Sequence, residues 1–208
     1  YRDDPLAHSL HGEYLYRAAG DCRGALRALG RALKLDPKDP DTHWWTGQVY
    51  QLGLNRPARA RCSYLAAVEA DPRYAPALDS LADLAESGGR FIEAIDWTKA
   101  HYRLARSAAD LASLAGLYAR LGNARAAGKY GRLAARRDPR SARAWLVLAR
   151  ALALAGRTRA SANALARFDA LADRQTGPFL SAVDLAGLEE VLDLPGMRGL
   201  RERLPVSL

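Results

Sequence analysis

The chain has 208 residues, enough for one or two domains, and its 49% apolar and 26% charged residues are typical of a globular rather than a disordered protein. Its longest apolar stretch, residues 144–156, contains Arg150 and is shorter than the roughly 18 residues of a membrane helix, so no membrane span is expected. The net charge is +8, and all of the excess lies in residues 105–208, which indicates an anionic partner without identifying it.

The first residues resemble the end of a helical unit. The sequence starts at Tyr1 rather than Met, and Asp3–Pro5 repeats an Asp-Pro turn that recurs later. We therefore expect further helical units of the same kind before residue 1. The N-terminal end of the series of units would then be exposed and would offer a surface for homo-oligomerisation.

Asp-Pro turns recur at Pro37, Pro72 and Pro139, and Arg106 occupies the position where this series lacks a proline. Proline has no amide donor and disfavours a helical predecessor, so each Asp-Pro pair is expected to end a helix. Glycines about half a period earlier are suited to tight turns between two helices. These glycines are Gly20, Gly53, Gly88, Gly89, Gly122 and Gly156. The expected unit is helix, turn, helix over roughly 34 residues, and neighbouring units must stack to bury their apolar faces.

In chain order, residues at these spacings resemble the tetratricopeptide repeat (TPR) family. Unit one matches at Ala25, Leu29, Ala32 and Pro37; unit two matches at Gly47 and Tyr50, with a turn one residue longer. Unit three matches at Leu81, Ala82, Gly89 and Ala94, although its second helix departs from the pattern at His101. Unit four is the clearest, at Leu111, Leu114, Ala115, Tyr118, Gly122, Ala127, Ala134 and Pro139, and unit five matches at Trp145, Leu148, Ala149, Leu152 and Gly156.

The expected fold is therefore all-α: a right-handed superhelical solenoid of about five TPR-like helix-turn-helix repeats over residues 6–175. After Gly177–Pro178 the pattern changes, and Ser181 with Asp184 has the spacing of a capping box. Residues 178–204 are expected to form C-terminal capping helices.

The resemblance also implies a function. First helices of successive TPR units line a concave groove that binds peptides, which predicts a non-enzymatic scaffold for a peptide segment or partner protein, by analogy in a bacterial assembly, secretion or envelope complex. The groove would be aromatic, then acidic, then basic along the chain. Its expected residues are Tyr14, Arg17, Trp44, Gln48, Gln51, Asp79, Asp83, Glu86, Arg120, Arg143 and Arg150, with Trp45 beside them.

The basic run in residues 121–145 divides between the two faces. Residues 125, 129, 132 and 136 step by 4, 3 and 4, so they share one side of a second helix that is expected to face solvent. Arg120, Arg143 and Arg150 lie on first helices, where they are suited to an acidic segment of a partner.

Chemistry-bearing motifs are nearly absent. His8, His11 and His43 lack the cysteine or carboxylate that would complete a metal set, and no phosphate loop or GxSxG motif occurs. We expect no enzyme activity and no cofactor. Cys22 and Cys62 are expected to be unpaired, buried thiols, and they do not indicate a compartment.

Two alternatives remain open at this stage. The basic second half favours binding of nucleic acid or another polyanion, and the array is also compatible with a repeat domain of a larger enzyme. The sequence identifies neither the partner nor the oligomeric state.

Overall fold

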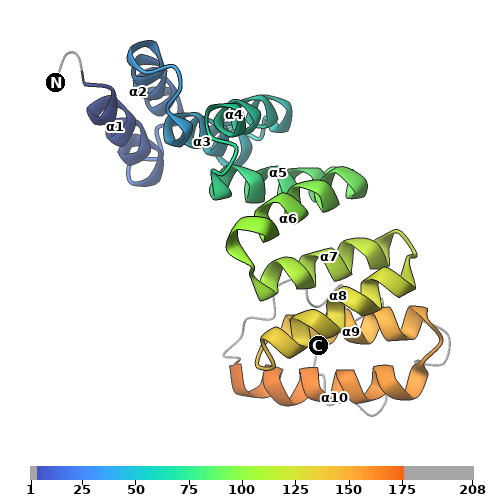
Figure 1. The fold of residues 1–208 in the computed structure, drawn as a ribbon. Coiled ribbons are helices and arrows are strands. Elements are labelled where there is room, and N and C mark those ends of the chain that lie inside the picture. Colours follow the sequence, from blue (N-terminus) through green and yellow to red (C-terminus); the bar gives the residue numbers. More distant parts are fainter. Residues whose placement is uncertain (1–3, 176–208) are drawn as a thin grey trace. The chain divides into compact units, whose positions relative to one another are not determined.

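The computed structural model describes residues 4–175, and these residues contain ten α-helices, one π-helix and no strand (Figure 1). The all-α prediction is confirmed for them, whereas the expected capping helices at 178–204 lie outside the described residues. The helices are α1 (Pro5–Arg17), α2 (Cys22–Leu35), α3 (Pro40–Gln48), the π-helix η1 (Val49–Gly53), α4 (Pro57–Ala70), α5 (Ala75–Ser87), α6 (Phe91–Ala105), α7 (Ala108–Arg120), α8 (Ala124–Arg137), α9 (Ala142–Leu154) and α10 (Thr158–Gln175).

The chain divides into two compact units, Tyr1–Leu104 and Ala105–Leu208, called here the N-terminal and C-terminal units. Helices α1 to α6 form three pairs in the N-terminal unit, and α7 to α10 form two pairs in the C-terminal unit. In the C-terminal unit α8 packs against both α7 and α9, and α9 packs against α10. The expected alternation of first and second helices is confirmed.

The Asp-Pro turns end helices as predicted, and the structure shows how. Asp36, Asp71 and Asp138 each follow the last residue of a helix and have left the helical backbone conformation. Each side chain accepts a hydrogen bond from the amide two residues further on, at 3.1, 2.8 and 3.0 Å respectively. This local turn competes with helix continuation, so the boundary is built by neighbouring residues alone.

The turns inside the pairs confirm the glycine prediction at four positions. Gly20, Gly89, Gly122 and Gly156 have φ between 66° and 72°, which strains any residue with a Cβ atom. The same expectation is wrong for Gly53, because the chain there forms η1 and reaches positive φ two residues later, at Asn55. The turn that looked one residue longer is therefore a widened helical turn.

Small residues let the paired helices approach closely. Gly47 of α3 faces the ring of Tyr64 on α4, and a Cβ atom at Gly47 would lie only 2.3 Å from that ring. Tyr64 is fully buried and packs with Ala60, Leu81 and Leu84 in one core cluster of the N-terminal unit. The match of Gly47 to a small-residue position of the repeat therefore has a direct packing reason.

Both cysteines are unpaired, as expected. The prediction of burial is wrong for Cys62, which is exposed on α4, and only partly right for Cys22, which is half-buried. The periodic pattern identified the helix of Cys62 correctly but not the side of that helix that meets solvent.

Candidate functional site

The first helices of the N-terminal unit are joined by a chain of polar contacts. The indole Nε1 of Trp44 donates to Ser80 Oγ at 2.9 Å, across from α3 to α5. Gln48 donates its Nε2 to Tyr64 OH at 3.1 Å, and that hydroxyl donates to Gln51 Oε1 at 2.8 Å. Gln48 Nε2 also donates to Ser80 Oγ at 3.4 Å, so three predicted groove residues are held in one network, which fixes their orientation.

Tyr64 is the buried centre of this network. Desolvation raises its pKa well above that of a free tyrosine, so the hydroxyl keeps its proton and remains a donor. Trp44 packs against the cluster that contains Tyr64, and Gln48 bonds to the Tyr64 hydroxyl. Both predicted groove residues are therefore supported by a buried, uncharged side chain.

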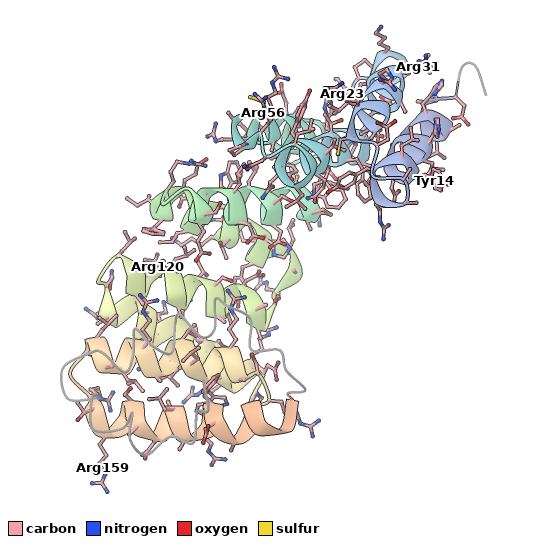
Figure 2. The ribbon with its side chains drawn as sticks, turned by 180° about the vertical axis from the view of Figure 1, so that it is seen from behind. Tyr14, Arg23, Arg31, Arg56, Arg120 and Arg159 are labelled. Carbon is pink, nitrogen blue, oxygen red and sulfur yellow. The ribbon has the colours of Figure 1, made fainter. Side chains whose placement is uncertain are left out.

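Aromatic and charged side chains gather where α1 meets α3. Trp45 lies edge-on to Tyr16 with ring centroids 6.4 Å apart, and the guanidinium of Arg17 lies 5.8 Å from the Trp45 ring. Arg17 also pairs with Glu13 at 2.8 Å. Tyr14, one of the predicted groove residues, projects from α1 and is 61% exposed (Figure 2). An exposed aromatic ring of this kind is suited to contact with a partner.

A pocket of about 420 Å³ opens between α1 and α3. Its apolar wall includes Leu6, Leu10 and Trp45, and the first two are more than half exposed. Four carboxylates line it as well: Glu13, Asp36, Asp39 and Asp41. This combination favours a segment with apolar and basic side chains.

Sequence reasoning missed this acidic pocket. The "DPKDPD" stretch was interpreted only as a turn, although three of its aspartates line the pocket. Asp39 also caps α3 by accepting from the amide of Thr42 at 3.1 Å, and the hydroxyl of Tyr74 donates to Asp41. Burial, reinforced by that hydrogen bond, raises the pKa of Tyr74 above its usual value. The density of aspartates in one turn was the available signal.

Asp79, Asp83 and Glu86 lie on α5 with the expected spacing. Asp79 and Asp83 are exposed, and Glu86 is half-buried. Acidic residues of the N-terminal unit therefore lie both around the pocket between α1 and α3 and on α5, the first helix of the third pair.

In the C-terminal unit, the structure brings one predicted residue into contact with a neighbouring first helix. Arg143 of α9 donates its Nη2 to Ser113 Oγ of α7 at 3.4 Å. Arg120 is exposed at the end of α7 (Figure 2), and Arg150 is half-buried on α9. All three arginines lie on first helices of the C-terminal unit.

The basic residues of α8 face solvent, which confirms the sequence prediction. The four that share one side of the helix are all exposed, and Lys129 lies with its Nζ 5.6 Å from the ring of Tyr130. We call this set the α8 stripe; it comprises Arg125, Lys129, Arg132 and Arg136.

Two other features are absent from the described residues. Within residues 4–175, no three His, Cys, Asp or Glu side chains are grouped as a metal ion would require. No helix in the same part of the chain combines the length and apolar character needed to cross a membrane.

Comparison with known families bears directly on the helix pairs of the N-terminal unit. Residues 14–53 match a family described as TPR repeat, and residues 50–109 match a family described as tetratricopeptide repeat. Residues 14–109 are therefore tetratricopeptide repeats. A search among curated protein sequences finds no match to this TPR chain.

Solved structures support the same fold. A MamA crystal structure matches with TM-score 0.73 and 22% identity, over 82% of this TPR chain and 93% of the other. The pilF protein of Pseudomonas aeruginosa matches with TM-score 0.68 and 20% identity, over 98% and 93%. YrrB, described as a TPR protein with an unusual peptide-binding site, matches with TM-score 0.72 and 16% identity, over 90% and 93%. At these identities the likeness confirms the repeat solenoid fold alone.

Proposed function

We propose that this TPR protein is a non-enzymatic scaffold that holds a peptide segment of a partner protein on the first helices of its N-terminal unit. The observation that carries the proposal is the network that fixes Trp44, Gln48 and Gln51 on Tyr64 and Ser80, beside the acidic pocket between α1 and α3. Residues held in place before binding lose little entropy when a ligand arrives. TPR membership and the peptide-binding description of YrrB agree with this role.

The charges favour a particular partner chemistry. Glu13, Asp36, Asp39 and Asp41 surround the pocket, and Asp79 with Asp83 adds two exposed carboxylates on α5. A partner segment that carries lysine or arginine beside apolar residues would complement this surface. Exposed Tyr14, Leu6 and Leu10 would contact its apolar side chains.

Peptide selection tests the proposal. A library of short random peptides is selected on the immobilised chain, and enriched peptides are synthesised and titrated by calorimetry. We expect basic, apolar sequences whose affinity falls at least about tenfold with Tyr14→Ala or with the double change Asp79→Asn and Asp83→Asn, since a charge-assisted contact contributes about 1.5–3 kcal/mol.

Matched controls come from second helices. Asp96→Asn removes an exposed carboxylate from α6, and Leu133→Ala shortens an exposed apolar side chain on α8. Both should leave peptide affinity within about twofold of the parent. If no peptide is enriched, or if the control changes weaken binding as much as the first-helix changes, the proposal is wrong.

A second candidate function, binding of an anionic partner by the C-terminal unit, is supported by its basic residues. Arg120, Arg143 and Arg150 on first helices are suited to an acidic peptide, whereas the α8 stripe is suited to a polyanion such as RNA. Replacing the three first-helix arginines with Ala should weaken binding of an oligoglutamate peptide more than replacing the four residues of the α8 stripe with Ala. The opposite order, with retention on RNA falling steeply in salt, would assign binding to the stripe. Equal losses would mean that only net charge matters.

A further inference from the structure

A second pocket lies at the turns of the second and third helix pairs. Its volume is about 620 Å³, within the range of pockets that hold a small ligand or a few side chains. It is lined by η1, by the first turns of α4, by the end of α5 and by Arg90, and it shares only Gln51 with the predicted groove residues. It therefore overlaps the surface of the proposed function only at Gln51.

One wall of the pocket is apolar and open to solvent. Leu52 lines it from η1 and is 67% exposed, while Leu84 contributes a buried side chain from α5. Leu52 is exposed at the pocket because it lies in η1, where the wider π turn contains one residue more than an α turn. Such π turns often accompany functional sites.

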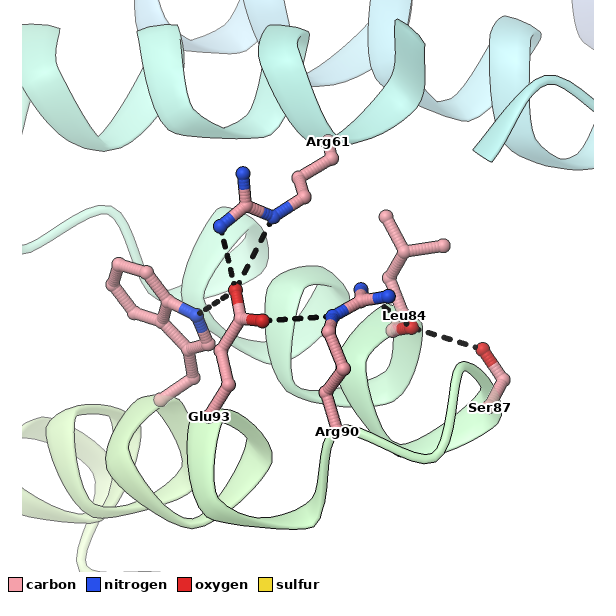
Figure 3. Close-up of polar contacts among 6 residues, drawn as sticks. Arg61, Leu84, Ser87, Arg90 and Glu93 are labelled. Carbon is pink, nitrogen blue, oxygen red and sulfur yellow. Dashed lines mark hydrogen bonds and ion pairs between the residues drawn. The ribbon is translucent and has the colours of Figure 1, made fainter. Parts of the chain in front are cut away.

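The polar wall is built on two guanidinium groups that share one carboxylate (Figure 3). Arg61 donates Nη2 and Nε to Glu93 Oε1, at 2.8 and 3.2 Å, and Arg90 donates Nε to Oε2 at 2.8 Å. The Arg61 hydrogen bond, with help from Arg90 and Trp97, holds the pKa of Glu93 below its usual range. Glu93 is therefore ionised at neutral pH, and the cluster keeps one net positive charge.

Both arginines retain donors. The side chains of Arg61 and Arg90 are 43% and 45% exposed. Arg61 uses only Nε and Nη2 for Glu93, so among the described residues its Nη1 has two N–H groups left for a ligand. Arg90 uses Nε for Glu93 and Nη2 for the Leu84 carbonyl, and its Nη1 lies over Gly88. The donors of both residues thus border the same pocket.

We propose that this turn pocket binds a partner peptide in which a leucine-sized apolar side chain adjoins an aspartate or glutamate carboxylate. The carboxylate would accept from Arg61 and Arg90, as Glu93 already does, and the apolar side chain would pack on Leu52 and Leu84. Charge complementarity selects this occupant, because the rim carries two guanidinium groups against a single carboxylate.

The test uses the probe peptide N-acetyl-Leu-Glu-Leu-amide, titrated into the full chain and followed by the amide NMR signals of the turn residues. We expect saturable shifts at Leu52, Ser87 and Gly88, and at least about tenfold weaker binding of the twin peptide with Gln in place of Glu. Arg61→Ala and Arg90→Ala should each weaken binding at least about fivefold. Leu52→Ser should weaken it about threefold through the apolar wall.

A charge-preserving variant separates geometry from simple attraction. A Cβ atom at Gly88 would lie 2.6 Å from Arg90 Nη1, the flexible end of that side chain, so Gly88→Ala moves the guanidinium without removing its charge. We expect this variant to fold normally and to weaken the probe about threefold or more. Arg73→Ala, which removes a positive charge in the turn beyond the opposite end of α4, should change affinity by less than about twofold.

Further outcomes separate failure of the turn pocket from failure of the proposed function. Tyr14→Ala, which is expected to weaken peptide binding on the first helices, should leave binding of the probe unchanged, so failure of either proposal is recognised separately. Equal binding of the Gln twin, binding of inorganic phosphate as tight as the probe, or unchanged affinity in both Arg61→Ala and Gly88→Ala would overturn the turn pocket as a site for acidic, apolar peptides.

Discussion

Gly47→Ala is the most direct test of how the candidate site is supported. The added Cβ atom would lie 2.3 and 2.5 Å from two ring carbons of Tyr64, whereas ordinary contact begins near 3.4 Å, so the ring must withdraw by about 1 Å. Tyr64 is fully buried, and its hydroxyl bonds to Gln48 and Gln51 at 3.1 and 2.8 Å, so this shift breaks at least one of these bonds.

The magnitude follows from three contributions. Overpacking a filled core costs about 1–3 kcal/mol, and a lost hydrogen bond adds about 1 kcal/mol. The better helix propensity of alanine offsets about 1 kcal/mol of this loss in the free energy of unfolding. We therefore expect Gly47→Ala to lower the free energy of unfolding by about 2 kcal/mol, measured by urea denaturation followed by far-UV circular dichroism.

The control is Gly30→Ala on α2. No atom lies within 4 Å of the position that its Cβ would occupy, so this change should stabilise the chain by about 0.5–1 kcal/mol. A double-mutant cycle with Tyr64→Ala completes the test, because Gly47→Ala should become mildly stabilising, as Gly30→Ala is, once the ring is gone. If Gly47→Ala is as stabilising as Gly30→Ala, the proposed packing of Gly47 on Tyr64 is refuted.

Two further predictions follow from the polar contacts and the cysteines. Glu93→Gln should lower the free energy of unfolding by about 0.5–1 kcal/mol at neutral pH. Because the folded pKa of Glu93 is lowered, this difference should persist above the usual glutamate pKa of about 4.3 and vanish as pH falls through the folded value; a difference that grows in acid would contradict the assignment. Cys62, exposed on α4, should react with a thiol reagent at least about tenfold faster than half-buried Cys22, and equal rates would show that their exposures are misassigned.

The sequence by itself determined the helix pairs and most of their boundaries. Asp36 and Asp138 end helices through hydrogen bonds to amides two residues away, and Gly20 or Gly122 turns the chain through its own backbone torsion. These interactions are local, so a short pattern of residues suffices to predict them. The exposure of the α8 stripe was also predictable, since helical periodicity places its members on one side and long charged side chains favour solvent there.

Only the tertiary structure decided which side chains meet. Trp44 reaches Ser80 across 36 positions of the sequence, and Arg61 reaches Glu93 across 32. Such contacts depend on how one helix pair stacks on the next, and a one-residue change in a turn rotates the faces that meet. The π-helix η1 is that kind of change: it shifts positive φ from Gly53 to Asn55 and leaves Leu52 exposed. The turn pocket therefore has no signature in the repeat pattern, because it is formed where the chain departs from that pattern and where distant arginines converge.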